Sequence, residues 1–287
     1  MTEAKRRLWT IVGLTAPAYL WLTLTIFLPL SAMLFFSFLV KAPFGGREIE
    51  FTLKHYDAFL TKSYLQVLTW RSLTLGFHVT AICIAVGFPA AYVLAKQVHG
   101  RWREALFLLV VLPFWSNALV RIFSWTIVLR PDGVLDRAAQ FVLPGLPTFD
   151  LAHSYPAIVI GLVHSYLPYM ILTCYLSLQA IDDSLIEAAR SLGASGLTIL
   201  RRIIVPLGLP GLATGSILIF VPVIGSFFEP RLLGGLQGIM LGTVIEDQFT
   251  AVFNWPLGAA LSFILLLIVL AILAVSWPLL RGVMRAA

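Results

Sequence analysis

Charged side chains are scarce in this sequence, and their scarcity excludes most classes of soluble protein. They make up 12% of the 287 residues, whereas an ordinary soluble domain carries about 25%. Hydrophobic residues make up 59%. Several apolar runs reach the roughly 18 residues that a helix needs to cross a hydrocarbon core of ~30 Å. The composition therefore predicts an all-α polytopic membrane protein.

The chain also lacks the motifs of an ATPase or a hydrolase. A phosphate-binding P-loop needs Gly-Lys-[Ser/Thr], and every lysine here follows a residue other than glycine. The motifs HExxH and GxSxG are absent as well. The sequence therefore excludes a Walker-type ATPase within this chain, and it leaves an intramembrane enzyme without a recognisable catalytic constellation.

Cysteine and histidine are few and scattered. The two cysteines, Cys83 and Cys174, each lie inside an apolar run, which predicts buried, unpaired thiols rather than a disulfide framework or a metal site. His78 and His164 also lie within apolar runs, where packing is favoured over a proton relay unless a polar network surrounds them. The net charge of +6 does not indicate nucleic-acid binding, because the basic residues flank apolar segments and form no single basic face.

About six spanning segments are predicted, near residues 8–38, 70–95, 105–129, 155–180, 203–227 and 257–280. The first is about twice as long as the core of a signal peptide and is predicted to remain as a helix.

Lysine and arginine near the segment ends set the orientation. With the N-terminus in the cytoplasm, the cytoplasmic set is the larger one: Lys5, Arg6, Arg7, Lys96, Arg101, Arg103, Arg190, Arg201, Arg202, Arg281 and Arg285. The opposite set is Lys41, Arg47, Lys54, Lys62, Arg137 and Arg231. Both termini are therefore predicted to be cytoplasmic.

The most polar interruption is EAARSLGASGLTILRRIIVPLGLP, residues 187–210, between the fourth and fifth predicted spans. Ser184 and Glu187 have the spacing of a capping box that begins a short helix. Gly193 is predicted to end that helix in a left-handed conformation, and Ser195 to cap a second helix that enters the membrane. Two interpretations stay open from the residues alone: a helix–turn–helix that inserts into a partner's groove, or an ordinary amphipathic loop packed against its own bundle.

This segment resembles the EAA motif of ABC importer permeases, at Glu187, Ala188, Ala189, Gly193, Ile203 and Pro206. Val205 stands where that family often has leucine. The resemblance implies a type I permease architecture in which loop 182–206 is a coupling loop that docks in a cytoplasmic ATPase subunit. It also implies an assembly with a second permease subunit, two ATPase subunits and an external solute-binding protein in a bacterial inner membrane. ATP and Mg would be bound by the ATPase subunits, and this chain would carry no cofactor.

Four further motifs resemble those of spermidine/putrescine-type permeases, in particular the first of two paired permeases. They are PFWSN at 113–117, LLGG at 232–235, IMLG at 239–242 and NWP at 254–256. The resemblance covers about residues 70–282, which predicts the permease core there and an N-terminal helix with an outer loop at 1–69. Arg231 stands where those permeases tend to carry an acidic residue, so an amino-acid-like, opine or other zwitterionic solute stays open beside a polyamine.

A polyamine is a flexible polycation, so its path should offer carboxylates and aromatic faces. The candidates are Glu229, Arg231, Phe227, Phe228, Trp125, Tyr166, Asp247 and Arg121. Simpler roles stay open for most of them. Glu229 and Arg231 could pair with each other, Phe227 and Phe228 could pack, and Asp247 could be solvated or touch the binding protein. Arg121 lies within a predicted span, where an ion pair, snorkelling and contact with the solute are all open.

A different class, an autonomous secondary transporter, would use carboxylates within its spans for ion coupling. The carboxylates of this chain are concentrated in predicted loops. Their placement favours a subunit that takes its energy from a partner.

Overall fold

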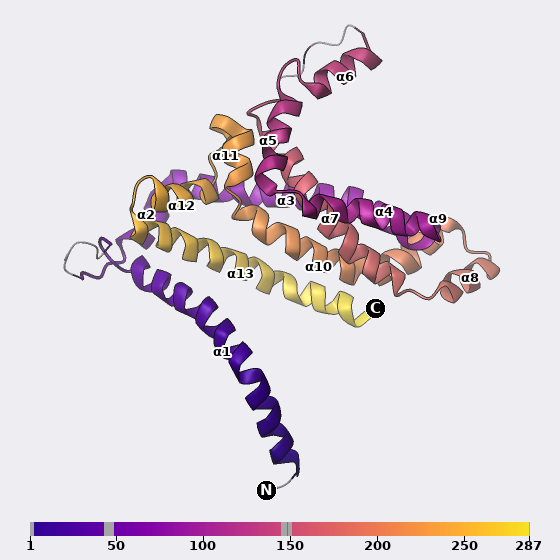
Figure 1. Cartoon of the computed structure of the whole chain (residues 1–287), viewed down its shortest axis with the longest axis horizontal. Coiled ribbons are helices and arrows are strands. Elements are labelled where there is room, and N and C mark those ends of the chain that lie inside the picture. The colour runs from indigo at the N-terminus through magenta and orange to yellow at the C-terminus, as the bar shows by residue number, and fades with distance from the viewer. Residues whose placement is uncertain (1–2, 43–48, 145–147, 149–150, 287) are drawn as a thin grey trace. The chain divides into compact units, whose positions relative to one another are not determined.

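The computed structural model describes residues 3–42, 49–144, 148 and 151–286, and it is almost wholly helical (Figure 1). Within these residues the β structure amounts to an isolated bridge between Leu39 and Phe51. The α-helices are α1 (Glu3–Ser37), α2 (Lys54–Thr61), α3 (Ser63–Tyr92), α4 (Arg101–Val111), α5 (Ala118–Leu129), α6 (Val134–Val142), α7 (Tyr155–Gln179), α8 (Asp183–Ser191), α9 (Gly196–Ile199), α10 (Val205–Ile224), α11 (Phe228–Gly234), α12 (Leu241–Thr250) and α13 (Trp255–Ala286). Shorter turns are the π-helices η1 (Val93–Gln97) and η3 (Leu200–Ile204) and the 3₁₀-helices η2 (Leu112–Trp115) and η4 (Gly235–Gly238).

Among the described residues, 5 segments are long and apolar enough to cross a bilayer: Val12–Ser37, Ser63–Gln97, Tyr155–Gln179, Gly196–Ile224 and Trp255–Ser276. A bent pair of helices raises the total to 6 when the pair is taken as one span. The predicted polytopic all-α fold is confirmed. The cytoplasmic placement of the termini stays a prediction, and Arg47, one of the residues on which it depends, lies outside the described residues.

The third predicted span, 105–129, is not one continuous helix. Its two halves, Arg101–Trp115 and Ala118–Leu129, meet at an angle of 97°. Pro113 lies in the turn η2, and the Asn117 side chain caps α5 by accepting a hydrogen bond of 2.8 Å from the Leu119 amide. Proline removes a backbone donor, and asparagine is a strong N-cap, so together they end one helix and begin another. The third predicted span is therefore a pair of helices with a break between them.

The chain forms two compact units, and neither is a single stretch of sequence. The first contains Met1–Ser63 and Ile245–Leu266. Within it the Tyr56 hydroxyl donates to Ser37 Oγ over 2.8 Å, and the rings of Phe36 and Trp255 meet edge to face. The second contains Tyr64–Val244 and Leu267–Ala287. The predicted boundary near residue 69 stays a prediction.

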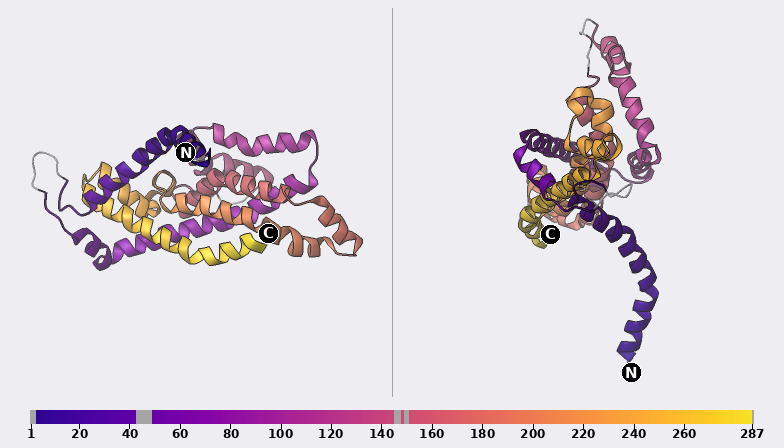
Figure 2. Two further views of the ribbon diagram at one scale, coloured as in Figure 1. Left: turned by 90° about the horizontal axis from the view of Figure 1, so that it is seen from below. Right: turned by 90° about the vertical axis from the view of Figure 1, so that its left-hand side faces the viewer.

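The core of the second unit is built on α7 and α10, which lie side by side in Figures 1 and 2. Gly211 allows their close approach, since a Cβ there would lie 2.6 Å from the Thr173 carbonyl oxygen. Both cysteines are buried in this unit, as predicted. The short helix α8 lies beyond the end of α7 in both figures.

Candidate functional site

The loop after α7 folds into α8 because Asp182 caps it. Its Oδ1 accepts a hydrogen bond of 2.9 Å from the Ser184 amide, and this bond holds the pKa of Asp182 below its ordinary value of 3.8. The predicted cap, Ser184, was wrong by two positions. A carboxylate at the helix start satisfies a free amide and is favoured by the helix dipole, so α8 begins before Ser184.

Gly193 ends α8 as predicted, with φ +82°. The Gly193 amide donates to the Arg190 carbonyl over 2.9 Å, and the Ala194 amide donates to the Ala189 carbonyl over 3.0 Å. This pair of bonds is a Schellman motif, which satisfies two carbonyls that would otherwise have no partner at the helix end.

The second helix of the loop also forms as predicted. Ser195 Oγ accepts the Thr198 amide over 3.3 Å at the start of α9. The chain then runs through the π-turn η3, which contains half-buried Ile203, and into α10, where Pro206 lies in the first turn. Proline fits there because a first-turn residue needs no backbone donor.

One face of α8 is apolar and exposed. Leu185 and Leu192 are 47% and 89% exposed. With exposed Ala188 they occupy positions i, i+3 and i+7, so they lie on one side of the helix. We call Leu185, Ala188 and Leu192 the α8 face. Glu187 is exposed as well, whereas Ala189 is half-buried and Ile186 is buried against the core. An exposed apolar face on an otherwise polar loop is typical of a surface that binds another protein.

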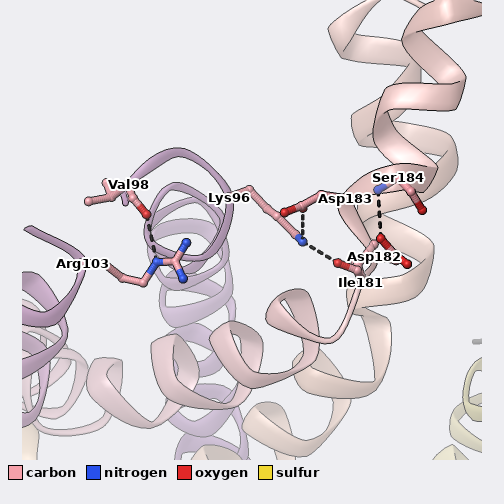
Figure 3. Close-up of polar contacts among 7 residues, drawn as sticks. All are labelled: Lys96, Val98, Arg103, Ile181, Asp182, Asp183 and Ser184. Carbon is pink, nitrogen blue, oxygen red and sulfur yellow. Dashed lines mark hydrogen bonds and ion pairs between the residues drawn. The ribbon is translucent and has the colours of Figure 1, made fainter. Parts of the chain in front are cut away.

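The start of α8 is held by a lysine from η1, the π-turn that continues α3. Lys96 Nζ lies 2.6 Å from Asp183 Oδ1 and 2.6 Å from the Ile181 carbonyl oxygen (Figure 3). Its hydrogen bond and its charge hold the pKa of Asp183 below the ordinary value of 3.8. The sequence counts Lys96 only as a topology signal.

A second group of polar and aromatic residues gathers where α11 packs against both α5 and α7. Trp125 Nε1 donates to His164 Nδ1 over 3.2 Å, and their rings are 5.4 Å apart. The ring of Tyr166 lies 5.9 Å from that of Tyr169, which in turn meets Phe114 at 4.7 Å. Of these, the sequence names Trp125 and Tyr166, and it interprets His164 as a packing residue.

The carboxylate of this group is Glu229, near the start of α11. Its Oε2 accepts a hydrogen bond of 2.6 Å from Ser226 Oγ, and the side chain is half-buried. The adjoining rings of Phe227 and Phe228 are 4.4 Å apart. Arg231 follows Glu229 by two positions, and residues two apart on a helix do not face each other. The helix geometry therefore does not favour a direct pair between Glu229 and Arg231.

Arg121 lies on α5, one turn before Trp125. Its Nη1 donates to the Pro113 carbonyl over 3.1 Å. Its buried Nε has no hydrogen-bond partner among the described residues. The remaining candidate, Asp247, lies on α12 in the first unit, so it is not grouped with these residues here.

Comparisons with known proteins identify the family. The family described as "Binding-protein-dependent transport system inner membrane component" matches residues 87–278. The chain belongs to this family.

The permease is 36% identical over 268 residues to the spermidine/putrescine transport system permease protein PotB of Escherichia coli (strain K12), across 93% of this chain and 94% of the relative. It is 35% identical over 244 residues to PotB of Haemophilus influenzae, across 84% of each chain. A solved bacterial ABC transporter that imports alginate has the same fold, with a TM-score of 0.74, 16% identity and 96% of each chain covered. The chain is thus a multi-pass inner-membrane permease subunit of a binding-protein-dependent ABC importer, and its relatives are transport proteins rather than enzymes.

Several residues of the permease's site were not identified from the sequence. Leu185 and Leu192 carry a readable signal, the i, i+7 spacing of leucines on a short polar helix. His164, Tyr169 and Ser226 carry none, because their neighbours come from other helices.

Proposed function

We propose that the permease forms half of the translocation path of an importer for spermidine/putrescine-type polyamines. The observation that carries the proposal is its 36% identity, over nearly the whole length of both chains, to a permease of that system. The group around Glu229 supports it, since a half-buried carboxylate with aromatic rings nearby suits an ammonium group.

The α8 face is proposed to dock in a cytoplasmic ATPase subunit, with Glu187, Ala188, Ala189, Gly193, Ile203 and Pro206 shaping the coupling loop. Partners in this assembly are a second permease subunit, two ATPase subunits and an external solute-binding protein. ATP and Mg are bound by the ATPase subunits, and both termini of this chain lie in the cytoplasm. Exposure of Leu185 and Leu192 supports this arrangement, because a partner would cover them.

The order of the helices along the chain suggests how motion of the ATPase subunits could reach the solute path. α8 connects to α7 at one end and, through α9 and η3, to α10 at the other. Closure of the ATPase pair would move α8, and α7 and α10 would move with it because their backbones touch at Gly211. Since α7 and α11 pack together, the motion would reach the residues around Glu229.

A second candidate, import of an amino-acid-like or opine-like zwitterion, is favoured by Arg121. A buried guanidinium nitrogen without an acceptor costs free energy, about 1–3 kcal/mol for an unsatisfied group, and a solute carboxylate would supply an acceptor. Phe227, Phe228, Trp125, Tyr166 and Arg231 contribute the remaining polar and aromatic surface in both cases. Asp247, in the first unit, is a separate candidate for contact with the solute.

Uptake by the reconstituted importer separates the two candidates. Proteoliposomes that contain the permease, its partner subunits and its binding protein should import radiolabelled spermidine. Putrescine should compete and octopine should not. Competition by octopine with no effect of putrescine would support the zwitterion and remove the polyamine.

The docking role of α8 has its own test, the substitution Leu192→Asp. Leu192 is 89% exposed, so a charge there should leave folding intact but lower the amount of ATPase subunit that co-purifies. Leu236→Asp is the matched control, because Leu236 is also 89% exposed and lies on η4, away from the loop. Equal recovery of the ATPase subunit in both variants would refute the docking role.

A further inference from the structure

Lys96 is a nearly buried lysine whose ammonium group contacts the coupling loop. Its side chain is 7% exposed. Lysine is almost never buried without a partner, because its ammonium group loses hydration. Its two acceptors, the Ile181 carbonyl and Asp183 Oδ1, belong to the segment that joins α7 to α8 (Figure 3). The contact with Asp183 is an ion pair as well as a hydrogen bond.

The two contacts meet at the bend between helices. α7 ends at Gln179, and α8 begins at Asp183. The Ile181 carbonyl lies in the bend, and Asp183 is the first residue of α8. A donor that reaches both at 2.6 Å therefore fixes the angle at which α8 leaves α7.

The lysine itself comes from a different spanning segment. Lys96 lies in the π-turn η1, which continues α3 so that the two form one apolar segment, Ser63–Gln97. π-turns appear mostly as single turns within α-helices, and they are frequent at functional sites. The chain itself connects α8 to α7 and, through α9 and η3, to α10. Lys96 adds a contact between α8 and η1, the turn that continues α3.

We propose that Lys96 is a positioning residue for energy coupling, which clamps the start of α8 to α3 and so transmits the motion of the docked loop to a third spanning helix. The inference rests on the proposed docking of α8 in the ATPase subunit. Lys96 acts through α8 and touches neither solute nor nucleotide.

The neighbourhood offers a matched control. Arg103, on α4, donates from Nε to the Val98 carbonyl over 2.9 Å, just beyond η1 (Figure 3). Like Lys96→Met, Arg103→Met removes one positive charge and one hydrogen bond to a backbone carbonyl. The carbonyl that it loses belongs to Val98, which lies outside the α8 segment.

The test measures ATP hydrolysed per spermidine imported by proteoliposomes that hold the complete importer. Lys96→Met should raise this ratio about fivefold, the lower end of the usual range for coupling between sites, while the subunits still co-purify. Asp183→Asn should raise it less, because the bond to the Ile181 carbonyl remains. The double variant should match Lys96→Met, since both contacts pass through one ammonium group.

A purely structural role would lower the yield or Tm of the complex and leave the ratio unchanged. A wild-type ratio in Lys96→Met, or an equal rise in Arg103→Met, overturns the proposal. If the importer does not assemble with Lys96→Met, Asp183→Asn becomes the deciding variant, because the Asp183 side chain is 72% exposed and its replacement should not disturb folding. A wild-type ratio in Asp183→Asn would then overturn the proposal. If Leu192→Asp retains its ATPase subunit, the proposed docking fails; if only the Lys96 and Asp183 variants behave as wild type, this inference alone fails.

Discussion

Substitution of Gly193 isolates the geometry of the turn that follows α8. Gly193 has φ +82°, and a Cβ there would meet no atom within 4 Å, so backbone strain is the penalty that a side chain brings. A left-handed backbone costs an L-residue about 1–2 kcal/mol relative to glycine. That cost lowers the ratio of formed to unformed turn by about 5- to 30-fold. Asparagine tolerates this region better than alanine, and a β-branched residue is a genuine outlier in it.

We therefore expect ATP hydrolysed per spermidine imported to rise in the order Gly193→Asn, Gly193→Ala, Gly193→Val. The assay is uptake and phosphate release in the same proteoliposomes. Gly196→Ala is the control, because Gly196 lies in the same loop, also has open space around its Cα, and has no positive φ. Wild-type uptake at wild-type ATP cost in Gly193→Val would refute the reasoning.

Two further predictions concern charge. Glu229→Gln should lower spermidine uptake about tenfold, since a hydrogen bond to a charged group contributes ~1.5 kcal/mol. The affinity of the binding protein for spermidine should not change. Glu104→Gln, at an exposed position of α4, is the control, and equal uptake by the two variants would remove Glu229 from the path. The pKa of Asp183 lies below 3.8 because Lys96 donates a hydrogen bond to it, so the stabilisation from this contact is present above 3.8 and is lost only as pH falls through the lowered pKa. ATP cost per solute should therefore stay flat from about pH 8 to pH 5, and a rise within that interval would contradict the assignment.

Local chemistry explains why much of the loop could be predicted from sequence. The left-handed turn at Gly193 and the cap at Ser195 depend on residues within a few positions of each other, and both are confirmed. The start of α8 was misplaced because Asp182 and Ser184 are both good caps, and in the structure the Asp182 carboxylate accepts the helix amide. The break in the third span was not predicted because hydropathy averages over Pro113 and Asn117.

Contacts between distant helices could not be predicted in the same way. Lys96 and Asp183 are 87 positions apart, and His164 and Trp125 are 39 apart. No periodicity in a single sequence links such pairs, because they are brought together by the packing of α3, α5 and α7. The roles of the predicted path residues remain predictions for the same reason.

The glycine contact between α7 and α10 also bears on leakage. A membrane importer must pass its cargo without letting water and ions through beside it. At Gly211 the backbones are so close that an added carbon would lie 2.6 Å from one atom and 2.7 Å from another, which leaves no room for a water molecule of radius ~1.4 Å. The seam between these two helices is therefore closed to water at that point, where the Gly211 backbone lies against the Thr173 carbonyl and the Ser177 side chain.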